Sequence, residues 1–181
     1  MTATPELTAR SGRAADIVAA ARIILEKEGA DALTMRRLAA DVGIQAPSLY
    51  KHFPTKRAVE TAIIAEVLLE VGEILHAAVA APGRAGPVRS LLDAYHDAAK
   101  ANPAMYRLAT SGRFPREDLP PGLEDWAGRP FFIATGEPWK AQALFSFAHG
   151  MVILELDERF PPGSDLGRTW KAGAAAFTSR S

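Results

Sequence analysis

The sequence of 181 residues contains no cysteine, which excludes disulfides, thiolate metal sites and cysteine nucleophiles. It also has no uninterrupted apolar run of the roughly 18–20 residues that a membrane-spanning helix requires. The N-terminal stretch MTATPELTARSGR lacks the apolar segment of a secretory signal. We therefore expect a cytoplasmic protein with no membrane partner.

Motifs for catalysis and cofactor binding are missing as well. The sequence shows no G-x-S-x-G elbow, no P-loop, no dinucleotide-binding fingerprint and no H-E-x-x-H pair. His149 and Glu155 are six positions apart, which is a poor spacing for two ligands on one face of a helix. We expect no enzyme activity, no catalytic residues, no metal ion and no cofactor.

Charge is balanced over the whole chain but unevenly distributed along it. Residues 1–57 carry nine Lys or Arg and six Asp or Glu, a net charge of +3, so the remaining residues carry −3. A basic block followed by a more acidic remainder fits a polyanion-binding head on a neutral or acidic body. An imbalance of three charges can also arise by chance, so this pattern is only a hint.

Apolar residues recur at helical spacing through nearly the whole chain. Ile17, Ile24 and Leu25 illustrate the stripe of the first helix, and Gly29 is well placed to end it. Alternating β-branched runs are absent, which argues against a sheet. Five prolines between 113 and 138 leave room only for a short helix at 123–127 or 130–135. The pattern predicts an all-α protein of eight or nine helices, the clearest at 13–28, 35–42, 45–53, 56–81, 88–102, 103–112, 138–158 and 165–178.

Residues 34–53 have the pattern of a helix-turn-helix motif. Thr34 can cap the first helix, Gly43 tolerates the positive φ of a tight turn, and Pro47 falls in the first turn of the second helix. Leu49 and Phe53 can face a small core beneath the motif. A helical hairpin that does not bind DNA is the alternative interpretation.

The outward side chains of this motif suit a nucleic acid. The start of a recognition helix lies near base edges in the major groove, and a Gln there can bond adenine in a bidentate way. Lys56 begins the next helix, where a phosphate is also favoured. The candidate base contacts are Gln45, Ala46, Pro47 and Ser48, and the candidate phosphate contacts are Thr34, Arg36, Tyr50, Lys51, His52 and Lys56.

The stretch TMRRLAADVGIQAPSLYKHFPTKRAV resembles the DNA-binding domain of TetR/AcrR-family repressors. The family pattern is roughly T-x-x-x-L-A-x-x-x-G-(V/I)-x-x-x-x-L-Y-x-H-F-x-x-K, and the resemblance covers about residues 13–63. It implies base contacts from Gln45, Ala46, Pro47 and Ser48, with Lys51 undecided between base and phosphate, and phosphate contacts from Thr34, Tyr50, His52 and Lys56.

The same resemblance implies how the chain is organised. We expect a flexible N-terminal tail at 1–12, a three-helix DNA-binding domain at 13–57, and a helical ligand-binding and dimerisation domain at 58–181. FAHG at 147–150 also resembles a branch of the family named for a Trp-His-Gly signature, although Phe147 and Ala148 stand before His149 and the Trp is missing.

The 138–158 helix is apolar on nearly all faces, and only part of this apolar surface can be buried within its own subunit. We expect a two-fold homodimer in which it packs with the last helix of each subunit, although an internal helix of a monomer would have the same composition. The candidate interface residues are Phe145, His149, Gly150, Val152, Ile153, Leu156, Trp170, Gly173, Ala174 and Phe177.

Apolar and aromatic side chains between the long helix and the dimer helices predict a pocket for a small hydrophobic or aromatic effector. Each of them is also a normal core residue, and a hydrogen-bonded core histidine is an alternative for both His96 and His149. The candidate lining residues are Leu91, Tyr95, His96, Met105, Tyr106, Trp126, Phe131, Trp139, Phe147 and Met151.

These features together predict a bacterial, homodimeric transcriptional regulator, a repressor that an effector releases from operator DNA. A ligand-independent regulator or an activator would share every motif. A helical enzyme and a partner-binding adaptor with a decayed motif are more remote alternatives.

Overall fold

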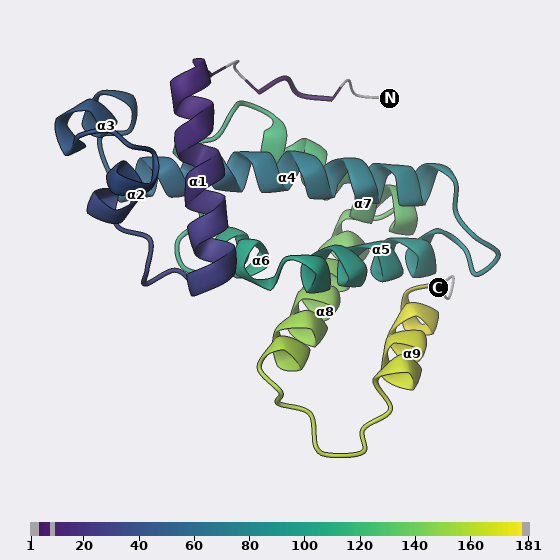
Figure 1. Ribbon diagram of the computed structural model, residues 1–181. Coiled ribbons are helices and arrows are strands. Elements are labelled where there is room, and N and C mark those ends of the chain that lie inside the picture. Colours follow the sequence, from purple (N-terminus) through teal and green to yellow (C-terminus); the bar gives the residue numbers. More distant parts are fainter. Residues whose placement is uncertain (1–3, 8–9, 179–181) are drawn as a thin grey trace. The chain divides into compact units, whose positions relative to one another are not determined.

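The computed structural model describes residues 4–7 and 10–178, and within these ranges the protein is all-α. There are nine α-helices and a short 3₁₀ helix in the described part, with no strand, which confirms the predicted fold class (Figure 1). The helices are α1 Gly12–Glu28, α2 Met35–Asp41, α3 Ala46–His52, α4 Lys56–Ala80, α5 Pro87–Ala101, α6 Pro103–Thr110, α7 Leu123–Thr135, α8 Pro138–Leu156 and α9 Leu166–Thr178, with the 3₁₀ helix at Arg116–Asp118.

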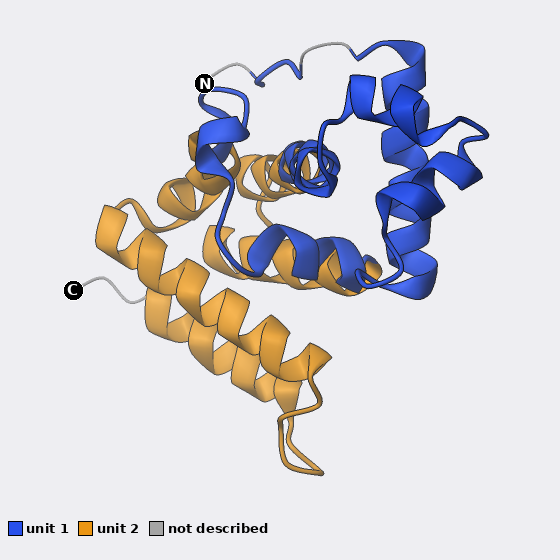
Figure 2. Ribbon diagram, turned by 90° about the vertical axis from the view of Figure 1, so that its left-hand side faces the viewer, with its two compact units in different colours: residues 1–69, 102–124 blue, residues 70–101, 125–181 orange. Residues whose placement is uncertain are grey.

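The chain divides into two compact units (Figure 2). Unit 1 consists of residues 1–69 and 102–124, and unit 2 of residues 70–101 and 125–181. Helix α4 supplies residues to both, with the change after Leu69. The predicted functional boundary at 57/58 follows a different criterion and stays a prediction. Of the predicted tail 1–12, residues 1–3 and 8–9 lie outside the described residues, and Gly12 already belongs to α1.

In unit 1, α1 lies against α2 and α6, and α2 lies against α3. The apolar stripe of α1 is buried, as its spacing predicts. An acidic side chain on α4, Glu66, accepts hydrogen bonds from Arg10 and from Arg22 of α1, the latter at 3.2 Å. Arg10 also donates to the carbonyl of Ala62 at 3.1 Å. These bonds tie α4 to α1 and to Arg10, which lies two residues before the start of α1.

In unit 2, α5 lies against α8 and α9, and the last two helices lie side by side (Figures 1 and 2). The ring of Phe147 on α8 sits over Gly173 on α9, where a Cβ would come within 2.0 Å of the ring. Glu155 of α8 accepts hydrogen bonds from Trp170 of α9 at 2.5 Å and from His96 of α5 at 2.8 Å. Its side chain is only 8% exposed, so a buried carboxylate joins three helices.

Helix α7 differs from the prediction, because one continuous helix runs through Pro130 instead of stopping on either side of it. Proline has no N–H to donate to the carbonyl four residues earlier, which here is that of Trp126. The structure supplies a substitute: Nε2 of His76, on α4, lies 3.0 Å from the Trp126 oxygen, and the His76 ring stacks on the indole at 4.7 Å. Trp126 in turn packs on Gly72, where a Cβ would meet the indole at 2.3 Å.

Candidate nucleic-acid interface

The predicted helix-turn-helix is present as α2, a turn at Val42–Gln45 and α3. Thr34 caps α2, since its Oγ1 accepts a hydrogen bond from the backbone N–H of Arg37 at 3.1 Å. Gly43 has φ 68°, the left-handed conformation that glycine adopts without steric cost. The Ile44 N–H then donates to the Ala39 carbonyl at 2.9 Å, which closes the turn.

Helix α3 has an apolar inner face and a polar outer face. Leu49 is fully buried and Phe53, directly after the helix, is buried as well. Gln45 is the N-cap residue, but its side chain makes no cap hydrogen bond. On the outer face Tyr50 is 48% exposed. The predicted DNA-contacting side chains at positions 45, 47, 48, 50, 51 and 52 are all exposed, and Ala46 is half-buried.

Two more predicted phosphate contacts lie at the start of α2. Thr34 is exposed, and its hydroxyl proton is still available for donation after the cap bond to Arg37. Arg36 is exposed and has no hydrogen bond or ion pair within residues 4–7 and 10–178. Both groups can therefore reach an external anion.

Lys56, the predicted phosphate contact at the start of α4, already has partners inside unit 1. Its Nζ donates to the carbonyl of Ala30 at 3.0 Å and lies 3.5 Å from a carboxylate oxygen of Glu60. Thr55 caps the helix by accepting from the Ala58 N–H at 3.1 Å. Lys56 thus joins α4 to the α1–α2 connection, and an ammonium with three donors retains one for a phosphate.

The predicted effector-lining residues are divided between the two units. Met105 and Tyr106 lie on α6 in unit 1, and the others lie in unit 2. Trp139 is 73% exposed on the first turn of α8 and His96 and Phe147 are half-buried, whereas Leu91, Tyr95, Met105, Tyr106, Trp126, Phe131 and Met151 are buried.

Some of these residues meet in unit 2. Tyr95 and Phe131 make an edge-to-face contact at 5.7 Å, and the Phe145 ring lies 5.5 Å from that of Phe131. Phe145 was predicted for the dimer interface, so the cluster mixes residues from the two predicted sets. His96 is bonded to Glu155, the arrangement of a satisfied core histidine.

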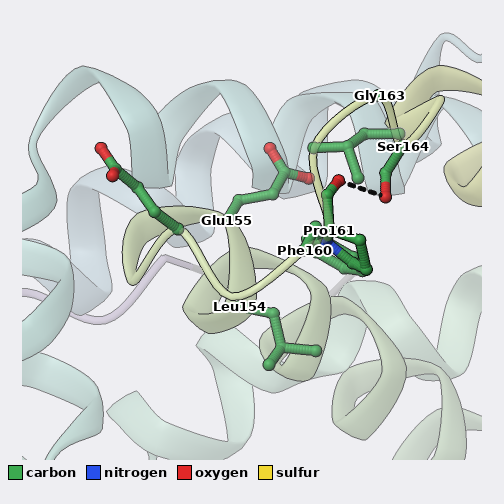
Figure 3. A pocket seen from close by; sticks show the side chains of 8 residues that line it. Leu154, Glu155, Phe160, Pro161, Gly163 and Ser164 are labelled. Atoms are coloured by element: carbon green, nitrogen blue, oxygen red, sulfur yellow. Dashed lines mark hydrogen bonds between the residues drawn. The ribbon is translucent and has the colours of Figure 1, made fainter.

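A cavity of about 210 Å³ lies elsewhere in unit 2, at the α8–α9 connection (Figure 3). None of its lining residues belongs to the predicted effector set; they are Leu154, Glu155, Glu158, Phe160, Pro161, Gly163, Ser164 and Leu166. In the described part of the chain no three His, Asp or Glu side chains are grouped so that they could hold a metal ion. No helix there is both long enough and apolar enough to cross a bilayer.

The predicted dimer residues lie on several faces of α8 and α9. Val152, Trp170 and Ala174 are buried within unit 2, and Gly173 and Phe177 lie against Phe147 of the same chain, with 6.0 Å between the Phe147 and Phe177 rings. Phe145 is 43% exposed, and His149, Gly150, Ile153 and Leu156 are half-buried. The His149 ring stacks on Phe145 at 6.0 Å, and burial lowers the pKa of His149 below its usual value.

Sequence reasoning missed the ion pairs that join α2 and α4 to α1 and to Arg10. Arg37 bridges Glu28 on α1 and Asp41 on α2, and Glu66 pairs with two arginines. The Arg37–Asp41 spacing of four residues is a readable signal for a helical ion pair. Glu28 carries no such signal, because its contact depends on the angle between two helices.

Comparison with known proteins places the N-terminal helices in a family. The model of the bacterial regulatory proteins, tetR family, matches residues 17–63. An uncharacterized HTH-type transcriptional regulator of Mycobacterium tuberculosis is 29% identical over 158 residues, which are 77% of this chain and 68% of that protein. The class A tetracycline repressor of Escherichia coli is 43% identical over 54 residues, 30% of this chain but only 25% of the repressor.

The fold agrees over nearly the whole chain. The structure of a TetR/AcrR-family transcriptional regulator from Thermobifida fusca superimposes with a TM-score of 0.64 at 18% identity, covering 94% of this chain and all of that one. At such identity the likeness shows a common fold, while the family model matches residues 17–63. Residues 17–63 therefore belong to the DNA-binding region of the tetR family of bacterial regulatory proteins, and the chain as a whole has the fold of a TetR/AcrR-family regulator.

Proposed function

We propose that the protein is a repressor that binds operator DNA as a homodimer and leaves it when a small apolar or aromatic effector binds. The observation that carries the DNA-binding part is the outer face of α3. There Tyr50, Lys51 and His52 are exposed while Leu49 and Phe53 hold the helix on its core.

The division of labour on that face follows from chemistry. Gln45 and Ser48 stand at the start of α3, the part of a recognition helix that lies near base edges. Tyr50, Lys51 and His52 follow one turn later and can donate to phosphate oxygens, which fix register without reading sequence. Arg36 and Thr34 extend the phosphate-binding set to the start of α2.

The direct test measures affinity for the intergenic DNA upstream of the protein's own gene. Tyr50→Ala and Lys51→Ala should weaken specific binding, whereas Lys171→Ala, an exposed lysine on α9, should leave it unchanged. Lys56→Ala is a poorer probe, because it also removes the bond to Ala30. If both α3 variants bind as tightly as the wild type, the proposed interface is wrong.

The proposed effector class rests on three side chains of unit 2. Tyr95, Phe131 and Met151 are buried there, and an apolar, aromatic set of this kind favours an apolar or aromatic ligand. Trp139 is exposed on the surface and is a better candidate for a protein contact than for an effector site. The branch assignment from FAHG stays a prediction.

Effector release can be tested by adding small aromatic compounds to the DNA complex and measuring bound DNA. A true effector should raise the melting temperature of the free protein, because it binds only the folded state, and should lower operator affinity. In vitro transcription from the adjacent promoter separates the alternatives: addition of protein lowers the transcript for a repressor and raises it for an activator.

The homodimer is supported by the surface of unit 2. Trp139 and Phe145 on α8, with Phe132 and Ile133 on α7, are large apolar side chains exposed to solvent in the single chain. Surfaces of this kind mark contacts between proteins. Sedimentation at micromolar concentration should give a dimer, and Trp139→Glu should shift the population towards monomer. A wild-type monomer under these conditions would contradict the proposal.

A further inference from the structure

Helix α2 carries two adjacent arginines with very different surroundings. Arg36 is exposed and makes no hydrogen bond or ion pair within residues 4–7 and 10–178. The guanidinium of Arg37 is enclosed by two carboxylates: its Nη1 and Nη2 donate to Glu28 at 2.9 and 2.7 Å, and its Nε donates to both oxygens of Asp41 at 2.9 and 3.1 Å. Arg37 therefore forms a fork between the last turn of α1 and α2.

The fork uses three of the five N–H donors of Arg37 and leaves one on each of Nη1 and Nη2. Two negative charges lie beside one positive charge, so the cluster is net negative. Hydrogen bonding from Arg37 lowers the pKa of Glu28, so this carboxylate stays ionised at neutral pH. A DNA phosphate placed here would meet an excess of negative charge.

The same contacts define where α2 sits. Arg37 is fixed at its backbone by the Thr34 cap and at its side chain by Glu28, so the first turn of α2 is held from two directions. Because α2 lies against both α1 and α3, its orientation determines how α3 is presented. A recognition helix must meet the groove in one register, so a small tilt weakens every contact at once.

We infer that Arg37 is a positioning residue of the DNA-binding motif, which orients α2 through Glu28 and Asp41, and that Arg36 is the arginine of α2 that contacts DNA. This inference rests on the proposed DNA-binding function. The inference predicts different salt dependences of DNA binding for variants of two neighbouring arginines, so each variant serves as the matched control for the other.

The experiment measures the salt dependence of binding by the full chain to an operator selected from random-sequence duplexes. Arg36→Ala should reduce the slope of log affinity against log salt by about 0.9, the value for one lost phosphate contact. Arg37→Ala should leave that slope unchanged and still lower operator affinity, by up to about fivefold, the scale of a solvent-exposed ion pair. A slope that falls equally in both variants overturns the inference.

Glu28→Gln and the double variant Glu28→Gln/Arg37→Ala guard against simple unfolding. Glu28→Gln keeps Arg37 but removes its partner: a positioning role predicts weaker operator binding, whereas a phosphate-binding Arg37 would bind DNA more tightly once freed. Glu28→Gln and Arg37→Ala should also be non-additive in melting temperature, which needs no DNA. Unchanged operator affinity in Glu28→Gln and in Arg37→Ala contradicts the inference while the proposed function stands. Failure of the wild type to select any sequence refutes the proposed function, and the role of Arg37 with it.

Discussion

Leu49 is the residue on which the outer face of α3 depends, because it is fully buried beneath that helix. Leu49→Ala should lower the free energy of unfolding by about 2–5 kcal/mol, since a buried leucine loses both its apolar contacts and the space it fills. Urea unfolding measures the change. Ser48→Ala, on the exposed side, should stay within about 0.5 kcal/mol of the wild type. Equal midpoints for the two variants would show that α3 is not held through Leu49.

The sequence predicts such residues when their role depends on local spacing. The cap at Thr34, the turn at Gly43 and the burial of Leu49 follow from neighbouring residues, and the structure confirms them. The Glu28–Arg37 contact could not be predicted in this way. It joins side chains on two helices, and the angle between those helices results from packing rather than from residue spacing.

At the scale of elements, the continuity of α7 depends on His76. Because a carbonyl oxygen can only accept, Nε2 of His76 must carry the proton that it donates to the Trp126 oxygen. His76→Ala should cost about 1–3 kcal/mol by leaving that oxygen without a donor. In a Pro130→Ala background the new backbone N–H can donate to the same oxygen, so His76→Ala should cost less. Thermal unfolding of the wild type, His76→Ala, Pro130→Ala and the double variant measures this coupling.

Gly128→Ala is the control for this cycle. Gly128 lies on α7, as Pro130 does, and a Cβ at Gly128 would meet nothing within 4 Å. Its effect should therefore add to that of His76→Ala without coupling. Equal coupling of His76 to Gly128 and to Pro130 would contradict the proposed replacement of a helical hydrogen bond.

A pH dependence is expected from His149 on α8. Burial lowers its pKa below the ordinary 6.5, so between the two values the unfolded chain binds more protons than the folded one. The contribution of His149 to stability is therefore complete above pH 6.5 and is lost as pH falls towards its folded pKa. His149→Gln should remove this part of the loss, measured as melting temperature between pH 7 and 5. Parallel losses in both proteins would exclude His149 as the cause.

Helices with clear apolar spacing were predicted almost to the residue, and α7 was not. The prediction stopped at Pro130 because proline normally ends a helix or kinks it. The compensating donor, His76, comes from α4, which is about fifty residues away in sequence. Gly173 was predicted for the dimer interface, and the structure shows it against Phe147 of its own chain. Its place in a dimer stays a prediction.

At the scale of the whole molecule, the basic part of the chain includes most of the residues that match the tetR-family model. The net charge of +3 over residues 1–57 covers the DNA-binding helices, and the remainder carries −3. The family and the all-α fold could be predicted because TMRRLAADVGIQAPSLYKHFPTKRAV combines buried and exposed positions in a specific pattern. The proposed effector could not be identified from the sequence, because common apolar side chains leave no comparable pattern there.

The central claim is that the outer face of α3 reads operator DNA, and selection from random-sequence duplexes by the full chain tests it most directly. The wild type should enrich a site with two related half-sites whose centres lie about 34–36 Å apart, one helical turn. Gln45→Ala should still bind but relax the preference at one base pair in each half-site, since base contacts specify and phosphate contacts do not. Enrichment of no sequence by the wild type, or of an identical one by Gln45→Ala and Ser48→Ala, would contradict the account.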